Sequence, residues 1–241
     1  MTTLVGDWLP NESLYLDKAS EPPVRPHRPL NQGDIFQDVT ICLTNRSGSG
    51  EPTPKTKICH AMLIGHPCSL RGGPKLAALQ NLVEVRPVKD AEADRFVEPW
   101  DSDFRLFPLR NLFPDKLWVA DFNVIGTVHF KLLEDRRMAC LSLAGWAALQ
   151  RRYANHSLRI DQSIELRMAD LRGLWNELAL WEEWCARGHA EPDFYTWVRN
   201  PIESEGPYKG TVRLEAIELA EDVIRAELPE PVIGPGESEH G

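Results

Sequence analysis

The spacing of hydrophobic residues changes once along the chain, near residue 135. Before that point, short apolar runs rich in β-branched and aromatic residues are separated by turn residues, which is typical of β-strands. Because no long helical pattern interrupts these runs, we expect a small antiparallel barrel or sandwich. The predicted strands cover residues 35–43, 57–65, 81–88, 104–109, 116–122 and 126–133.

After residue 135, apolar residues recur every three or four positions, as they do on the buried face of an α-helix. Trp175, Trp181 and Trp184 fall on one predicted helix, where we expect them to pack as a core against the barrel. The alternative is that they anchor a protein–protein interface. The pattern predicts helices over residues 138–153, from 164 to a glycine stop at Gly188, over 193–198 and over 212–228.

The first 30 residues contain a proline-rich segment, with four prolines between Glu21 and Pro29. Each proline fixes φ and lacks a backbone donor, so we expect an extended tether rather than packed helix or strand. The predicted fold class is α+β, an antiparallel β-barrel followed by a helical C-terminal extension. Its parts are a tether (1–30), a barrel body (31–135), a helical extension packed on the barrel (136–228) and a flexible tail (229–241).

Composition and charge indicate a globular protein and argue against several classes of function. A hydrophobic fraction of 42% is that of a globular chain, and a net charge of −9 argues against non-specific coating of DNA. No stretch approaches the about 20 consecutive apolar residues of a membrane helix, and the N-terminus does not resemble a signal peptide. The five cysteines are an odd number and suit reduced thiols, so we expect a cytoplasmic protein that does not interact with membranes.

Charge is distributed unevenly along the chain. Residues 161–241 carry a net charge of −11, whereas residues 101–160 carry +3, so an acidic protein can still present an anion-binding surface. A second expectation is that the acidic helical tail shields that surface, as a nucleic-acid mimic does. The alternative for the basic residues is that they complement a helix C-terminus and pair with nearby acids. The candidate nucleic-acid-binding residues are Arg46, Arg137, Arg151, Arg152 and Tyr153.

Two short segments carry a resemblance to a known family. The segment Gln32-Gly33-Asp34-Ile35-Phe36 and the later segment Gly65-His66-Pro67-Cys68 resemble the MazF/PemK family of toxin-like endoribonucleases over about residues 31–90. The resemblance implies an SH3-like barrel that acts on or binds RNA, in a toxin–antitoxin or phage-defence setting, with an antitoxin, a defence component or a second copy as partner. The alternative is a non-catalytic protein–protein interaction module that uses the barrel and the Trp-rich helix.

The chain departs from the family's catalytic pattern. The family usually has Arg-Pro before the second strand and Ser or Thr after the third, where this chain has Cys59-His60 and Arg86-Pro87-Val88-Lys89. RNA cleavage would therefore need other residues. The candidates are His60 or His66 as general base, with Arg46 or Arg71 stabilising the charge on the phosphorane.

Cys59, His60, His66 and Cys68 lie within ten residues, which raises the question of a zinc site. Neighbours on a strand point to opposite faces, so Cys59 and His60 are poorly placed to bind one ion, and we expect no metal and no other cofactor. A third hypothesis makes Cys68 a nucleophile beside His66 and Ser69. The simpler interpretation is that His66-Pro67 turns the chain after a buried strand.

Overall fold

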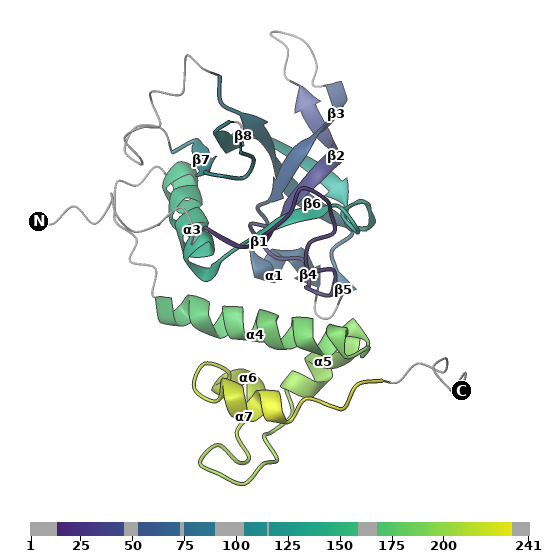
Figure 1. Cartoon of the computed structure of the whole chain (residues 1–241), viewed down its shortest axis with the longest axis vertical. Helices are drawn as coiled ribbons and strands as arrows, with labels where there is room; N and C mark the ends of the chain where they lie inside the picture. The colour runs from purple at the N-terminus through teal and green to yellow at the C-terminus, as the bar shows by residue number, and fades with distance from the viewer. Residues whose placement is uncertain are drawn as a thin grey trace, which may run out of the picture. The chain divides into compact units, whose positions relative to one another are not determined.

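Seven antiparallel strands from the first part of the chain form one sheet, in the order β1-β9-β2-β3-β6-β8-β7 (Figure 1). The computed structural model describes residues 14–45, 53–72, 75–89, 104–114, 116–158 and 168–232. The strands of the sheet are β1 (Tyr15–Lys18), β2 (Ile35–Asn45), β3 (Thr53–Leu63), β6 (Leu79–Pro87), β7 (Leu106–Leu109), β8 (Trp118–His129) and β9 (Arg137–Leu141). Between β3 and β6 lie α1 (Pro67–Leu70) and the short paired strands β4 (Arg71–Gly72) and β5 (Lys75–Leu76).

The sheet curls into a partial ring because β2, in addition to its pairing with β3, also meets β8, through the pair Cys42↔Thr127. Gly126 permits this approach, since a Cβ there would lie 2.9 Å from the Cβ of Ile41 and 3.0 Å from the backbone oxygen of Cys42. The structure therefore confirms an α+β protein with an antiparallel sheet. Buried residues of the ring include Phe36, Val39, Ile41, Ala61, Leu63, Leu82 and Val128.

One strand boundary and one helix start differ from the prediction, the first because of a bulge and the second because of strand pairing. The predicted strands at 116–122 and 126–133 belong largely to one strand, β8, which bends at a bulge opposite Val83 and Glu84 and therefore continues across the break in the hydrophobic pattern. The second prediction runs too far, since β8 ends at His129 and residues 130–132 form η3. Residues 138–141 were expected to be helical but form part of β9, where all five residues are buried. Pairing with β1 and β2 therefore outweighs the helical spacing at Met138. Helix α3 (Leu143–Leu158) begins only after Ser142, whose Oγ accepts a hydrogen bond from the N–H of Gly145.

Part of the predicted tether packs against the sheet. Strand β1 pairs with β9, and the N–H groups of Ala19 and Val24 donate to the carbonyls of Met138 and Arg137. Leu14 and Val24 are 4% and 5% exposed. Proline fixes φ but leaves intervening residues able to donate, so this segment uses its remaining N–H groups on an available strand edge.

The chain divides into two compact units, and the division falls at Arg167 rather than near residue 136. The sheet unit retains α3 together with η3 (Phe130–Leu132). The helical unit comprises Arg167–Gly241 with the short segments His27–Pro29 and Gly73–Lys75. Its helices are α4 (Met168–Ala186), α5 (Glu191–Val198), α6 (Arg213–Ala216) and α7 (Glu221–Ala226).

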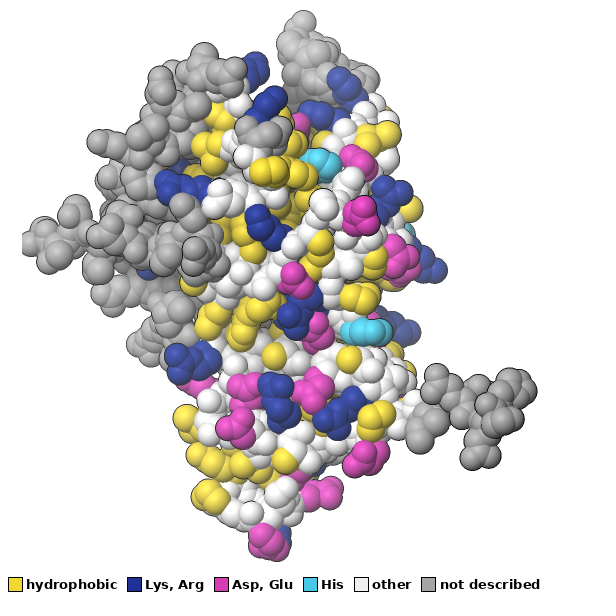
Figure 2. All heavy atoms as spheres, in the orientation of Figure 1, with side chains coloured by type: hydrophobic (Ala, Val, Ile, Leu, Met, Phe, Trp, Pro, Cys, Tyr) yellow, Lys and Arg dark blue, Asp and Glu magenta, His cyan; other side chains and the backbone are white. Residues whose placement is uncertain are grey.

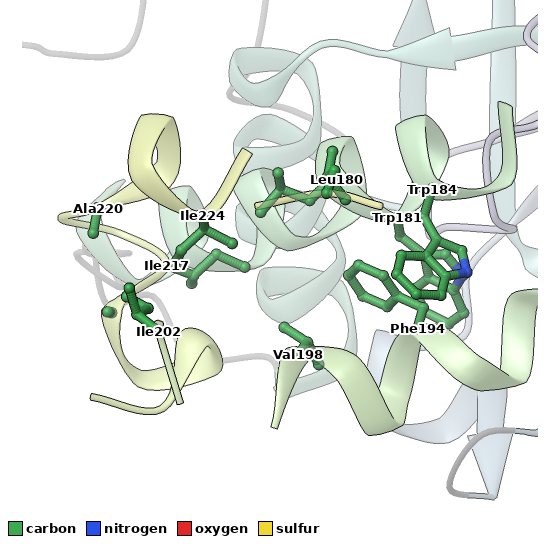
Figure 3. Close-up of a cluster of buried hydrophobic side chains, with 11 residues drawn as sticks. Leu180, Trp181, Trp184, Phe194, Val198, Ile202, Ile217, Ala220 and Ile224 are labelled. Atoms are coloured by element: carbon green, nitrogen blue, oxygen red, sulfur yellow. The ribbon is translucent and has the colours of Figure 1, made fainter. Parts of the chain in front are cut away.

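The helical unit has its own hydrophobic core, formed by α4, α5 and the α6–α7 segment (Figure 3). Trp181 stacks on Phe194 with ring centroids 5.2 Å apart, and Trp184 lies 5.4 Å from Trp197. Trp181 and Trp184 were expected to form a core against the barrel, but this aromatic core lies among residues of the helical unit itself. Their burial at 4% and 5% exposure also argues against the alternative in which they anchor a partner.

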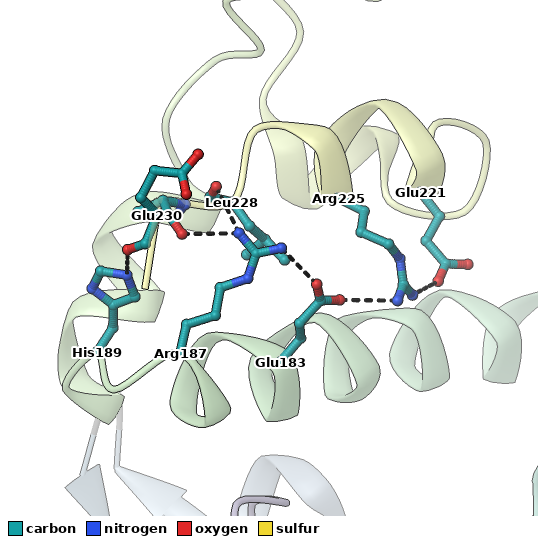
Figure 4. A network of polar contacts seen from close by, with 8 residues as sticks. Glu183, Arg187, His189, Glu221, Arg225, Leu228 and Glu230 are labelled. Atoms are coloured by element: carbon teal, nitrogen blue, oxygen red, sulfur yellow. Dashed lines mark hydrogen bonds and ion pairs between the residues drawn. The ribbon is translucent and has the colours of Figure 1, made fainter. Parts of the chain in front are cut away.

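The last predicted helix, over residues 212–228, is broken into α6 and α7. The break at Ile217–Ala220 turns the chain, so Ile217, Ala220 and Ile224 are all buried in one cluster. Glu183 of α4 accepts from both Arg187 and Arg225, and Arg225 also reaches Glu221 (Figure 4). The pair between Arg225 and Glu183 connects α7 to α4. At the end of α4 the glycine stop is confirmed, since Gly188 has a φ of +84°.

Candidate functional site

His60 lies on β3 beside an irregularity in its neighbour β2, where the register shifts between Phe36 and Val39. Asp38 occupies this bulge with a φ of +49°, a conformation that Asp tolerates better than most residues. The bulge directs the backbone N–H of Asp38 toward His60, where it donates to Nδ1 over 3.3 Å. Because of the extra residue in β2, a backbone donor and an exposed carboxylate both lie beside this imidazole.

This contact determines the tautomer of His60. A backbone N–H can only donate, so Nδ1 is the acceptor and the neutral ring carries its proton on Nε2. Burial lowers the pKa of His60 below its ordinary value of 6.5, and the Asp38 carboxylate opposes this effect. In this state Nε2 carries the proton and can donate to a ligand, whereas the general-base role predicted for His60 needs a nitrogen that is free to accept a proton.

Two aromatic side chains enclose the His60 ring. Its centroid lies 5.4 Å from that of Phe113 and 5.3 Å from that of Trp118, and these two rings lie 4.7 Å from each other. Phe113 and Trp118 are both partly exposed, and the His60 side chain is 18% exposed. The histidine therefore belongs to a cluster of three rings at the protein surface, which we call the ring cluster.

Arg136 adds a cation beside the ring cluster. Its Nη1 donates to the backbone oxygen of Asp38 over 2.6 Å, and its own carbonyl accepts from the N–H of Gln37. Arg136 is exposed, and a guanidinium has five N–H donors in a fixed fork. One donor holds the side chain beside Asp38, and the fork can use others to bind an anion. On the face drawn in Figure 2, Lys and Arg side chains lie among hydrophobic side chains over the sheet unit.

A pH titration tests this description of His60. We expect NMR of the ring protons to give a pKa below 6.5, and Asp38→Asn to lower the pKa further because it removes the charge that favours the imidazolium. Since the unfolded chain then binds the proton more readily than the folded chain, stability is expected to fall as pH drops below 6.5 and to be unaffected above it. Glu134→Gln, at an exposed position, is the control. A pKa above 6.5 would contradict the assignment.

A second polar cluster is formed by residues of β3, β6 and β8. Lys57 and Glu84 form an ion pair at 2.6 Å, and Arg86 and Asp121 form another at 3.2 Å. Glu84 and Asp121 are register partners on β6 and β8, so each carboxylate is neutralised beside the other. Burial and the Glu84 charge raise the pKa of Cys59 to about 11, which keeps this thiol protonated and unreactive.

The other predicted catalytic residues that the structure describes lie beyond the end of β3, in the segment that leads into α1 and β4. His66 precedes α1, and its carbonyl accepts from the N–H groups of Ser69 and Leu70. This arrangement is the turn that the simpler interpretation predicted. Arg71 lies half-buried in β4. Arg46 and the side chain of Cys68 lie outside the described residues, so their predicted roles stay predictions.

The predicted basic surface is partly internal. Arg137 is 6% exposed, pairs with Asp34 at 3.2 Å and donates to the carbonyl of Arg25. Arg152 is 5% exposed and donates to the carbonyl of Leu106. Arg151 and Tyr153 are half-buried, and the Tyr153 ring packs edge-on against Phe122. In this conformation Arg137 and Arg152 stabilise the sheet unit rather than present their guanidinium groups to solvent.

Four residues of the site were not among the predicted site residues: Asp38, Phe113, Trp118 and Arg136. A signal for Asp38 was present, because Gln37-Asp38 interrupts the apolar pattern of the first strand. Arg136 lies directly before β9 and is exposed, whereas Arg137 begins β9 and turns inward to Asp34, so the basic stretch alone did not tell the two arginines apart. Phe113 lies in the loop before β8 and Trp118 begins β8, and nothing in their spacing indicated that both would meet His60.

Within the ranges that the structure describes, no three His, Cys, Asp or Glu side chains are grouped as a metal ion would require. None of the helices in those ranges combines the length and the apolar composition of a membrane span. The chain matches no protein-family model, and a search of curated proteins finds no match either.

Proposed function

We propose that the sheet unit is an SH3-like barrel of the MazF/PemK kind and that it binds RNA on the face that carries His60. The toxin–antitoxin or phage-defence setting comes from the resemblance alone. The partial ring of β2, β3, β6 and β8 supports a small barrel, since four neighbouring strands return to their starting strand.

The residues that carry the resemblance have structural roles. Asp34 accepts from the N–H of Asn31 and pairs with Arg137, while Ile35 and Phe36 are fully buried. These contacts fix the entry to β2 and the packing of the ring. They support a shared fold, and the case for RNA depends on the side chains around His60.

One observation carries the proposal: a half-buried imidazole with its proton on Nε2, two partly exposed aromatic rings and an anchored arginine lie together around Asp38. A phosphodiester can accept hydrogen bonds from an arginine fork and from an imidazole N–H. Aromatic faces suit the unpaired bases of RNA, whereas double-helical RNA hides those faces. The combination of phosphate-binding donors and exposed aromatic rings supports single-stranded RNA as the ligand.

Binding of a labelled mixed-sequence single-stranded RNA, followed by fluorescence anisotropy, tests the proposal. We expect Arg136→Ala to weaken binding about tenfold. The slope of log affinity against log salt concentration is expected to fall by about 1, as for the loss of one phosphate contact. His60→Ala is expected to weaken binding about fivefold through the lost hydrogen bond. Arg199→Ala removes the same charge from the helical unit and is the control, with unchanged binding. Unchanged binding in both site variants would overturn the assignment.

The same samples separate a nuclease from a binding protein. If the chain cleaves the strand, loss of cleavage in His60→Ala with retention in His66→Ala and Arg71→Ala would assign the activity to the ring cluster. In that case Asp38 is the candidate general base, since its carboxylate is 59% exposed and lies 3.7 Å from Nδ1 of His60. Cleavage that survives all three changes would exclude the predicted catalytic residues.

A further inference from the structure

The ring cluster has a feature that phosphate binding does not use, namely the exposed surface of its two larger rings. Phe122 and Trp118 lie four residues apart on β8, but Phe122 is 1% exposed beneath Tyr153 and His156, whereas Trp118 keeps part of its ring exposed. Phe113 contacts Trp118 from the preceding loop and is also partly exposed. Large aromatic side chains left at a surface are a common mark of a binding site.

The surroundings of these rings combine apolar area with positive charge. Ile58 lies two residues before His60, on the same side of β3, and is 69% exposed. Arg136 is held beside Asp38, which in turn contacts His60. The acidic group at this place is the Asp38 carboxylate, which accepts from the Gln37 side chain. A purely apolar partner would leave the guanidinium and the Nε2 donor desolvated, so the charges favour a planar ligand that carries an anion.

We propose that Phe113 and Trp118 form a stacking surface for an unpaired nucleobase of single-stranded RNA, with His60 donating to an acceptor on the base edge or sugar and Arg136 holding the adjoining phosphate. This inference rests on the proposed RNA binding and adds how the strand is recognised. Stacking is possible because every base presents a π-face, and it tolerates any sequence. The site would therefore select unpaired over paired RNA.

The test compares four ligands with the full chain: a single-stranded RNA, the same strand with abasic sugars, the corresponding duplex, and AMP. Stacking contributes a factor of about 5 to 150 per base, so we expect the abasic strand and the duplex to bind at least about fivefold more weakly than the single strand. AMP makes one base contact and one phosphate contact, so it is expected to bind far more weakly than the strand.

The protein variants are Phe113→Leu and Trp118→Leu, which keep apolar volume but remove the aromatic face. Each is expected to weaken binding of the single strand about fivefold or more while leaving binding of the abasic strand unchanged. Phe130→Leu is the matched control, because this ring stacks on His129 at the other end of β8. Near-ultraviolet circular dichroism checks that each variant is folded, and Trp118→Phe, which retains a ring, is expected to restore most of the affinity.

The outcomes separate this inference from the proposed function. Strong binding that is equal for the single strand and the abasic strand, and equal in both leucine variants, would overturn stacking and leave RNA binding intact. AMP binding as tightly as the strand would also overturn it, because the occupant would be a free nucleotide. No binding of any RNA by the unmodified chain would overturn both proposals and would leave the ring surface to a protein partner.

Discussion

Glu227→Ala is expected to destabilise the helical unit by about 3–5 kcal/mol, because it strands a buried arginine. Arg213 is 4% exposed at its side chain and donates to Glu227 through Nε at 2.9 Å and Nη2 at 2.7 Å. The other carboxylate oxygen accepts from the N–H groups of Glu203 and Ser204 and from the Ser204 hydroxyl. One carboxylate thus ties the loop after α5 and the start of α6 to the end of α7.

Urea unfolding followed by tryptophan fluorescence measures this effect, since the helical unit holds Trp175, Trp181, Trp184 and Trp197. Glu221→Ala is the control, because its pair with Arg225 is far more exposed and the expected loss is below about 1 kcal/mol. A loss in Glu227→Ala no larger than that of the control would contradict the account.

Low pH is expected to weaken the same contacts, because it protonates the Glu227 carboxylate. Burial favours protonation of Glu227, but hydrogen bonds from Ser204 and Arg213 outweigh it and hold the pKa below the ordinary value of 4.5. A carboxyl with a lowered folded pKa contributes stability that is complete above 4.5 and is lost as the pH falls through the folded pKa. We expect that part of the acid sensitivity to be absent in Glu227→Gln.

Gly145→Ala is expected to destabilise the sheet unit by about 2–3 kcal/mol, although alanine favours helices. A Cβ at Gly145 would lie 2.2 Å from the backbone oxygen of Leu14. That oxygen accepts from the N–H of Ser142, directly before α3. Relief of the clash must move the start of β1 away from α3, so hydrogen exchange at Ser142 and Ala19 should become faster.

Gly173→Ala provides the opposite case within α4. The nearest atom to a Cβ there is Cγ2 of Ile217 at 3.9 Å, so the substitution meets no clash. We expect it to stabilise the helical unit by about 0.5–1 kcal/mol through helix propensity. Thermal unfolding of the two variants should therefore shift in opposite directions. Stabilisation by both alanines would show that β1 does not lie against Gly145.

The hydrophobic pattern predicted most strands and the helical second half because burial imposes a period of two on strands and 3.6 on helices. It failed where tertiary contacts override local spacing. Residues 138–141 are apolar at helical spacing but pair with β1 and β2, and residues 212–228 break so that Ile217, Ala220 and Ile224 share one core. A bulge in β8 likewise hides the continuity of one long strand.

The candidate site was predictable only in part. His60 was identifiable because a histidine in a strand pattern is chemically conspicuous, and its partners were not because they come from β2, a loop and β8. Arg136 and Arg137 are adjacent, and only pairing of β9 decides that Arg137 turns inward to Asp34 while Arg136 remains exposed. Gln37-Asp38 marks an interruption in the apolar pattern of the first strand, but the sequence does not show that this interruption is a bulge whose N–H reaches His60.

RNA binding at the ring cluster of the sheet unit predicts which residues respond to RNA. Titration of the isotope-labelled full chain with single-stranded RNA, followed by NMR, tests it most directly, because each backbone amide and indole N–H reports its own position. We predict saturable shifts at Asp38, His60, Trp118 and Arg136 that weaken as salt is raised. Shifts confined to the helical unit, or no shifts at any RNA concentration, would contradict the account.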